Sequence, residues 1–242
     1  MMANIVTFTL YLCALHLVAS LPQPPISPCK LDDAACVNSA AQALLNYILS
    51  GVPDANIESS DPLYIDLIEA NDKGLYYKYS NSTITGFKDC KISNVRLSPS
   101  DSKLDFELHC KAQMAGKYLL KGRLLIIPVE GDGNVRIQGD DLKFVVNAAV
   151  KETVEDGVSH LSIKNFKLEV SAEQQVHFEF TNLFNGNKEL ADGVVKFANA
   201  NYQEVVKEIS PPVFYAIFKK IFKNVNKYLK LVPTSELYLL KN

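Results

Sequence analysis

The chain has 242 residues, of which 48% are hydrophobic and 21% are charged, and this apolar fraction excludes a chain that is disordered throughout. Its 25 basic and 27 acidic residues give a formal net charge of −2. Because no excess of positive charge is present to neutralise phosphates, we expect no nucleic-acid partner.

The first 20 residues are predicted to be a cleaved secretion signal. They carry no charged side chain, and the apolar run over 5–18 is shorter than the about 20 residues that a membrane span needs. Val18, Ala19 and Ser20 then supply the small residues that a signal peptidase prefers. A buried or anchoring N-terminal helix is the alternative. We therefore expect a secreted, extracellular protein in which residues 21–242 form a single domain and Asn81, in a sequon, carries a glycan.

A helix is predicted next, followed by a long series of strands. Asp32 and Asp33 can cap the helix, its apolar residues recur at helical spacing from Val37 to Ile48, and Gly51 helps to end it. The spacing of the apolar residues then changes to every second position, which predicts strands at 75–79, 91–97, 104–112, 118–127, 142–150, 161–170 and 176–180. Turn groups such as 131–134 and 156–157 separate them. No long helical pattern interrupts the series, so the sheet should be mostly antiparallel.

Four cysteines remain after the predicted signal, namely Cys29, Cys36, Cys90 and Cys110. They show no Cys-x-x-Cys spacing, which argues against zinc ribbons, and an even number in an oxidising compartment suggests two disulfides with three possible connectivities. Pairing Cys29 with Cys36 would attach the N-terminal arm to the first helix.

The Cys90–Cys110 pair is favoured by a predicted hairpin. The turn group 98–102 lies between two strands, and folding back about Ser100 sets Cys90 opposite Cys110 and Ile92 opposite Leu108. The apolar residues that follow Ile92 then fall out of phase, which predicts one bulged residue near 93–94. Two unpaired buried thiols are the alternative.

The C-terminal third returns to helical spacing. One apolar stripe runs from Leu190 to Ile209, and a second, richly aromatic stripe runs from Phe214 to Leu229. Pro211 and Pro212 lie between the stripes, and they fit the first turn of a new helix or a sharp kink. A long aromatic helix needs a large apolar surface to cover it. We therefore predict an α+β fold in which a strongly curved, mostly antiparallel sheet wraps the long C-terminal helix.

A further set of motifs extends along the chain: the runs 182–190 and 197–202, the paired prolines, Val232-Pro233, Pro28-Cys29-Lys30 with Cys36, Asp61-Pro62-Leu63 and Ile84-Thr85-Gly86-Phe87. Together these motifs resemble the takeout and haemolymph juvenile-hormone-binding family of insects. The resemblance covers essentially the whole chain after the predicted signal. It implies an apolar cavity or tunnel inside the curved sheet. It also implies a non-catalytic carrier of a small hydrophobic ligand, such as an isoprenoid hormone or a fatty-acid-like lipid.

Two departures from that family concern the ligand. Hormone-binding members have a second disulfide that reaches the C-terminal helix, whereas no cysteine follows Cys110 here. They also place a tyrosine, which meets the hormone's epoxide, on a strand shortly before the Asp156-Gly157 turn, and the matching stretch 143–148 has none. A takeout-type carrier of another ligand is therefore as well supported as a haemolymph transporter with epoxide-specific recognition. The Cys90–Cys110 pair belongs to neither pattern.

The expected ligand-binding residues are apolar. For the cavity lining we predict Phe197, Phe214, Ile217, Phe218 and Ile221 on the helices, with Phe144 and Val146 on a strand. We expect a monomer and no cofactor. Asp132, Asp140 and Asp141 lie beside glycines and could suggest calcium, but turn chemistry explains them better, so we also expect no metal. The sequence contains no nucleophile elbow, phosphate-binding loop or dinucleotide-binding glycine pattern, so we expect no enzyme; an esterase is a third alternative, which no nucleophile motif supports.

Five lysines follow the second C-terminal stripe on its opposite side: Lys219, Lys220, Lys223, Lys227 and Lys230. A core helix with a solvated face explains them. A helix lying on a membrane surface has the same pattern, so a membrane-active or lipid-transferring protein is a second alternative function, and transient membrane contact is compatible with the carrier.

Overall fold

The computed structural model describes residues 25–239, so the predicted signal at 1–20 lies outside the described residues. Its helices are α1 (Ala34–Ser50), α2 (Lys188–Ala200) and α3 (Tyr202–Leu229), with single-turn helices η1 (Pro53–Ala55), η2 (Phe87–Asp89), η3 (Phe184–Gly186) and η4 (Thr234–Glu236). The seven-stranded sheet comprises β2 (Leu63–Asp72), β3 (Leu75–Thr85), β4 (Lys91–Ser98), β5 (Lys103–Leu124), β6 (Ile127–Glu155), β7 (Val158–Ala172) and β8 (Val176–Phe180).

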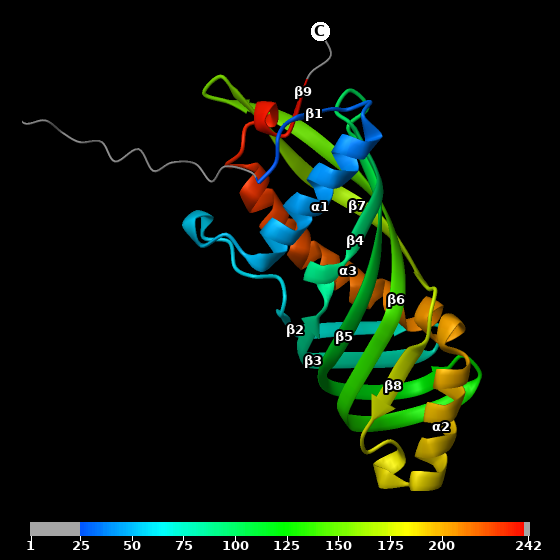
Figure 1. Ribbon diagram of the computed structural model, residues 1–242. Helices are drawn as coiled ribbons and strands as arrows, with labels where there is room; N and C mark the ends of the chain where they lie inside the picture. Colours follow the sequence, from blue (N-terminus) through cyan, green and yellow to red (C-terminus); the bar gives the residue numbers. More distant parts are fainter. Residues whose placement is uncertain (1–24, 240–242) are drawn as a thin grey trace, which may run out of the picture.

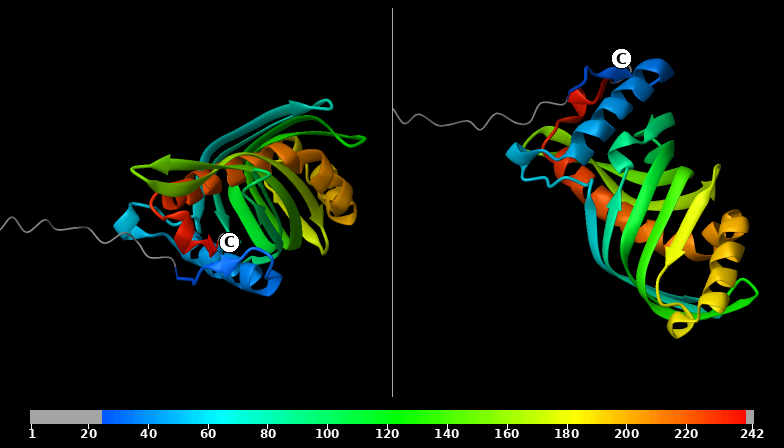
Figure 2. Two further views of the ribbon diagram at one scale, coloured as in Figure 1. Left: turned by 90° about the horizontal axis from the view of Figure 1, so that it is seen from above. Right: turned by 60° about the horizontal axis from the view of Figure 1, so that its bottom comes forward.

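The sheet is antiparallel and curves around α3. Its strands follow the order β2-β3-β5-β6-β7, while β4 adds to β5 and β8 adds to β6. Helix α3 contacts β7 and β2, the strands at the two ends of that order. Figures 1 and 2 show α3 held inside the curve, with α1 near one end of the molecule and α2 at the other. The predicted α+β fold is confirmed.

Helix α1 begins and ends where the sequence indicates. The Asp33 carboxylate accepts a hydrogen bond from the Cys36 backbone N–H at 3.0 Å, so one free donor of the first turn is satisfied. Gly51 follows the last turn with a φ of 92°, which few other residues adopt. The helix packs beside β4, and Figure 1 shows it crossing near the end of the sheet.

Several predicted strand boundaries are wrong. Segments 104–112 and 118–127 belong largely to one strand, β5, and the chain reverses at 125–126, inside the segment predicted as a strand. The glycine group 131–134 lies within β6 rather than at a turn. Its glycines admit close backbone neighbours, because a Cβ on Gly133 would lie 2.5 Å from the Thr181 carbonyl oxygen. Strand β2 was not predicted, because Tyr64 and Ile68 interrupt the alternation of Leu63, Ile65 and Leu67.

The predicted hairpin register is confirmed. Ile92 pairs with Leu108, and the register shifts between Ser93 and Arg96, where Asn94 adopts a φ of 53°. The structure joins Cys90 to Cys110, with 4.4 Å between their Cα atoms, and Cys29 to Cys36, with 5.8 Å. Both separations lie in the usual range for disulfides.

Replacing Cys90 and Cys110 together by alanine should lower the free energy of unfolding by about 3 kcal/mol, because the open chain gains loop entropy. The shorter Cys29–Cys36 loop should cost about 2 kcal/mol when it is opened in the same way. The sequence separations of 20 and 7 residues give this order. Urea unfolding of both double variants tests it. Equal losses would show that loop length does not set the contribution of these bonds.

The C-terminal helices divide at Asn201 and not at the prolines. Asn201 has φ −115° and ψ 37°, so α2 ends there and α3 begins at Tyr202. Helix α3 continues through Pro211 and Pro212, so of the two predicted alternatives, a new helix or a kink, the new helix at the prolines is wrong. The prolines remove the N–H partners of the carbonyls at 207 and 208. Residue 207 is exposed and residue 208 is half-buried, so water can donate hydrogen bonds to both carbonyls in place of the missing N–H groups.

The two ends of the described chain meet. The two-residue strands β1 (Cys29–Lys30) and β9 (Tyr238–Leu239) pair in parallel, and Figure 1 shows them together above α1. The Cys29–Cys36 disulfide ties β1 to α1. The N-terminal arm, the first helix and the C-terminal segment therefore form one unit at this end of the sheet.

Candidate functional site

Helix α3 divides into an inner apolar face and an outer basic face. Its buried residues include Ile209, Val213, Ile217, Phe218, Ile221 and Phe222. All five lysines noted above are exposed. The Lys220 ammonium donates a hydrogen bond to the Tyr64 carbonyl of β2, so one of these lysines fastens the helix to an edge of the sheet.

Three cavities follow one another along the inner face of α3. The larger cavity has a volume of about 190 Å³ and lies between α1, the C-terminal half of α3 and strands β4, β5 and β7. The smaller cavity, of about 60 Å³, lies between the middle of α3 and strands β3, β5, β6 and β8. A third void of about 20 Å³ continues toward α2. The spaces form a row along the helix.

The walls of the cavities are apolar. Hydrophobic side chains line the larger cavity throughout, and six examples from its different walls are Leu31, Leu45, Val95, Phe106, Ile163 and Leu237. The smaller cavity adds two polar residues, Gln113 and Ser210, to an otherwise apolar lining. Ser210 is buried, and its hydroxyl has no hydrogen-bond partner among residues 25–239. Such surroundings favour an apolar molecule over water.

The predicted lining residues divide into three groups. Phe214 and Ile217 line the smaller cavity, and Phe218 and Ile221 line the larger one. Phe144 and Val146 are fully buried behind these walls and are not among the lining residues. Phe197 is half-buried on α2 and lines none of the three spaces, because the break at Asn201 carries α2 away from the line of α3.

A cluster of aromatic rings separates the larger cavity from the smaller one. Phe87, on η2, lines both cavities. Its ring centroid lies 6.0 Å from that of Phe144 and 5.9 Å from that of Phe218. Phe144 also packs against Phe214, at 4.8 Å, and against Phe218, at 5.2 Å. We define the aromatic partition as Phe87, Phe144 and Phe218.

Sequence reasoning missed two parts of the site. It assigned no lining residue to α1, although the apolar stripe of that helix is visible in the sequence, and residues such as Leu44 and Leu45 form a wall of the larger cavity. It also missed Phe87 and Tyr79. The alternation of Leu75, Tyr77 and Tyr79 could have shown that Tyr79 faces inward, whereas Phe87 lies in a single turn with no periodic signal.

The buried tyrosines are neutral and mostly serve the fold. Burial raises the pKa of Tyr118 to about 12, and it raises the pKa of Tyr77 and Tyr79 well above the ordinary value. The Tyr77 hydroxyl donates to the Ile209 carbonyl at 2.9 Å, and the Tyr118 hydroxyl donates to the Thr181 carbonyl at 2.7 Å. These bonds fix α3 and the segment after β8 against the sheet.

No acidic or histidine side chain is among the described residues that line the three cavities, and several of these side chains form partly exposed ion pairs. His109 lies 3.0 Å from Asp141, and Lys111 lies 3.1 Å from Asp140. The hydrogen bond from Lys111 lowers the pKa of Asp140, so this carboxylate stays ionised. Between residues 25 and 239, no three His, Cys, Asp or Glu residues come together as a group that could hold a metal ion.

None of the helices formed by the described residues has the length and apolar character needed to cross a membrane.

Two further predicted positions lie on the surface. Asn147, in the stretch compared with the hormone-binding members, points away from the cavities, and its side chain donates to Asp105 at 2.9 Å. Its neighbours Val146 and Ala148 are buried instead. No hydroxyl from this part of β6 therefore reaches the cavities. Asn81 is exposed at an irregular point of β3, where a glycan would meet no steric obstacle from the core.

Comparisons with known proteins agree with this geometry. A family model described as haemolymph juvenile hormone binding protein (JHBP) matches residues 7–239. The chain is 24% identical to the circadian clock-controlled protein daywake of Drosophila melanogaster over 230 residues, which cover 88% of this chain and 87% of that protein. It is 40% identical to the juvenile hormone-binding protein of Manduca sexta over 73 residues, or 29% and 32% of the two chains. The crystal structure of Epiphyas postvittana Takeout 1 superposes with a TM-score of 0.84 at 32% identity, covering 89% of this chain and 100% of that one.

Proposed function

Because this chain belongs to the haemolymph juvenile hormone binding protein (JHBP) family, we propose that it is a secreted, non-enzymatic carrier that encloses one small hydrophobic ligand. The observation that carries the proposal is the row of apolar cavities along α3, which begins with a space of about 190 Å³. The takeout and juvenile hormone-binding relatives support this class of function.

The energetics of apolar burial suit such a carrier. A ligand that buries about 15 carbons gains on the order of 12 kcal/mol at about 0.8 kcal/mol per methylene. Association costs of roughly 4–15 kcal/mol are subtracted from this gain. Affinities in the micromolar to nanomolar range therefore need no strong polar contact.

The cargo that we propose is an elongated isoprenoid or fatty-acid-like molecule bound without an epoxide-specific contact. Asn147 faces outward, and the inward-facing residues of the same strand are apolar. The relative named for juvenile hormone binding keeps that hormone as the competing proposal. A carrier that recognises shape and apolar length should bind an epoxide-bearing hormone and its deoxygenated analogue equally well.

Extracellular use completes the proposal. Two disulfides support secretion, and so does the description of the family as haemolymph proteins. The exposed Asn81 sequon is available for a glycan. We propose that the carrier acts as a monomer and that the lysine-rich outer face of α3 permits brief contact with membranes during ligand uptake.

Native mass spectrometry tests the function. The secreted protein should take up one molecule from a panel of isoprenoids, sterols and fatty acids, because the cavities form a single row. Organic extraction of the purified protein should release the same class of lipid. Absence of uptake from the whole panel would contradict the carrier. Displacement of the hormone by its deoxygenated analogue at equal concentration supports recognition without the epoxide, and a preference of 10-fold or more for the epoxide would favour the hormone transporter.

A further inference from the structure

The larger and smaller cavities meet only at Phe87. Of all the residues that line them, Phe87 is the one that both share, and it is 1% exposed. Phe214 and Ile217 lie on the side of the smaller cavity, while Phe218 and Phe222 lie on the side of the larger one. The ring of Phe87 therefore stands between two apolar spaces that follow the same helix.

Neither space alone holds a long molecule. An engineered protein cavity of about 150 Å³ accommodates benzene. The larger cavity, at about 190 Å³, offers little more room, and the smaller one has about 60 Å³. An elongated ligand must therefore use both spaces, and it can do so only if the ring of Phe87 leaves its position.

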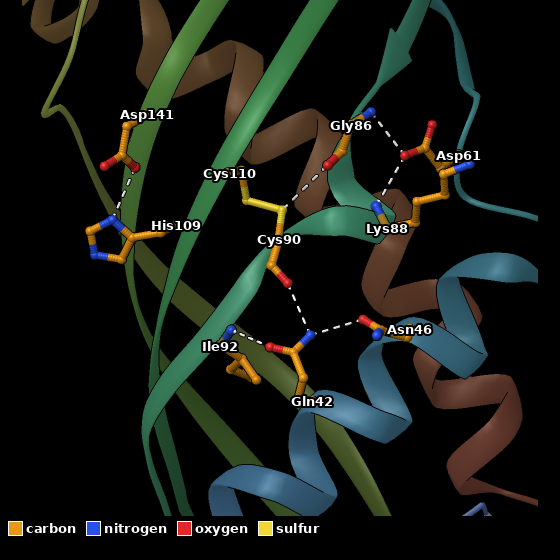
Figure 3. The surroundings of a disulfide bond; sticks show 10 residues. All are labelled: Gln42, Asn46, Asp61, Gly86, Lys88, Cys90, Ile92, His109, Cys110 and Asp141. Atoms are coloured by element: carbon orange, nitrogen blue, oxygen red, sulfur yellow. Dashed lines mark hydrogen bonds and ion pairs between the residues drawn. A yellow bond between two sulfur atoms is a disulfide. The ribbon is translucent and has the colours of Figure 1, made fainter.

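The turn that contains Phe87 is held by three attachments, and Figure 3 shows them at Gly86, Lys88 and Cys90. One Asp61 carboxylate oxygen accepts hydrogen bonds from the N–H groups of Gly86, at 2.8 Å, and Lys88, at 3.0 Å, which flank Phe87. The Cys90–Cys110 disulfide joins the end of the turn to β5. Because these restraints act on both sides of one residue, they fix where its ring enters the core.

Helix α1 provides the third attachment. The Gln42 side chain donates to the Cys90 carbonyl and accepts from the Ile92 N–H, both at 3.0 Å. Helix α1 is itself a wall of the larger cavity. The same helix therefore shapes the cavity and helps to fix the turn that closes it, which gives the Cys90–Cys110 hairpin a role beyond joining two strands.

We propose that Phe87 is the residue that sets the length of ligand this carrier accepts, and that Asp61 and the Cys90–Cys110 disulfide are positioning groups that hold its ring between the two cavities. The inference rests on the proposed carrier function. Short apolar chains fill the larger cavity, and longer chains gain affinity only when the Phe87 ring is displaced.

Saturated fatty acids of 8 to 20 carbons provide the probe. In the wild-type protein, affinity should rise about 4-fold for each added methylene and then level off once the larger cavity is full. In Phe87→Ala the rise should continue, so that the 18-carbon acid binds at least 10-fold more tightly than it binds to wild type. Phe87→Leu, which disturbs the core less, should show the same change to a smaller extent.

Phe106→Ala is the matched control. Phe106 lines the larger cavity but not the smaller one, and its substitution removes the same number of atoms. Equal changes in the chain-length profiles of Phe106→Ala and Phe87→Ala would mean that added volume alone is responsible, and would overturn the proposed role of Phe87. Asp61→Ala should extend the profile in the same direction by about 3-fold, and an unchanged profile would overturn its positioning role.

Met114 gives a readout inside the smaller cavity. It lines that cavity and is the only methionine beyond position 2, so its methyl group gives one assignable NMR signal in the secreted chain. The 18-carbon acid should shift this signal in Phe87→Ala, and the 8-carbon acid should leave it unchanged in wild type. A shift caused by the 8-carbon acid in wild type would overturn the separation of the cavities. Failure of wild type to bind any of the acids, in an assay that also finds no isoprenoid or sterol uptake, would overturn the carrier function itself.

Discussion

Phe144→Ala is expected to lower the free energy of unfolding by about 3–5 kcal/mol, because it removes a fully buried aromatic ring and leaves a void. Phe144 is 0% exposed and contacts the rings of Phe87, Phe214 and Phe218. These neighbours come from η2 and α3, so the loss affects the contact between the sheet and its enclosed helix. Urea unfolding followed by circular dichroism gives the free energy.

Tyr215→Ala is the control for aromatic contact on the same helix. Tyr215 stacks on Phe166 with ring centroids 4.9 Å apart, but it is 52% exposed. Its loss should cost about 1 kcal/mol, because little apolar surface returns to water and no enclosed void forms. Similar losses for Phe144→Ala and Tyr215→Ala would contradict the packing described for the aromatic partition.

Gly86→Ala is expected to destabilise the protein by about 4 kcal/mol, which is among the largest effects of a single methyl group. Gly86 has a φ of 102°, a conformation that residues with a Cβ rarely adopt. A Cβ at this position would also overlap the Lys111 carbonyl oxygen of β5. Because the nearest atoms, the Lys111 carbonyl group and the Ala112 Cα, all belong to the backbone, neither rotation of a side chain nor a small local shift relieves the overlap.

Gly157→Ala separates the two causes of the expected loss of stability in Gly86→Ala, namely the unfavourable backbone angle and the steric overlap. Gly157 has a φ of 82° at the β6–β7 turn, and an added Cβ meets no atom within 4 Å. Its substitution should therefore cost only about 1 kcal/mol for the unfavourable backbone angle. Thermal unfolding of both variants measures the difference, and a Gly86→Ala protein as stable as Gly157→Ala would exclude the steric overlap with β5.

Local sequence patterns predicted the fold because each element has a strong period. The stripe of α3 and the alternation in β5 and β7 require one enclosed helix and one curved sheet. The predicted strand boundaries were wrong where glycine can serve either a turn or a close approach between strands. At 131–134 it permits close approach within β6, and the sequence pattern is the same as that of a turn. The prediction of a helix boundary at the prolines of α3 failed for a related reason. Carbonyl groups that water can reach lose their helical N–H partners at low cost, so the helix can continue through the prolines.

The cavities were less predictable than the fold. A buried phenylalanine that fills the core and one that borders an empty space have the same sequence pattern, so Phe144 and Phe218 could not be told apart. Phe197 lies in the predicted apolar stripe 190–209, which spans parts of both α2 and α3, and only the backbone angles at Asn201 separate the two helices. Phe87 depends on contacts from three distant segments, which no local pattern contains.

The pairing of β1 with β9 determines when the larger cavity is closed during biosynthesis. Cys29 and Leu31 border the cavity from one end of the described chain, and Leu237 and Tyr238 border it from the other. A ribosome releases the chain from its N-terminus, so Tyr238 becomes available only after nearly all the other described residues have been made. The last wall of the cavity is therefore added when α1, the sheet and α3 have already been synthesised. A ligand enclosed in the cavity must enter when that wall forms or later, and it is not trapped by the growing chain.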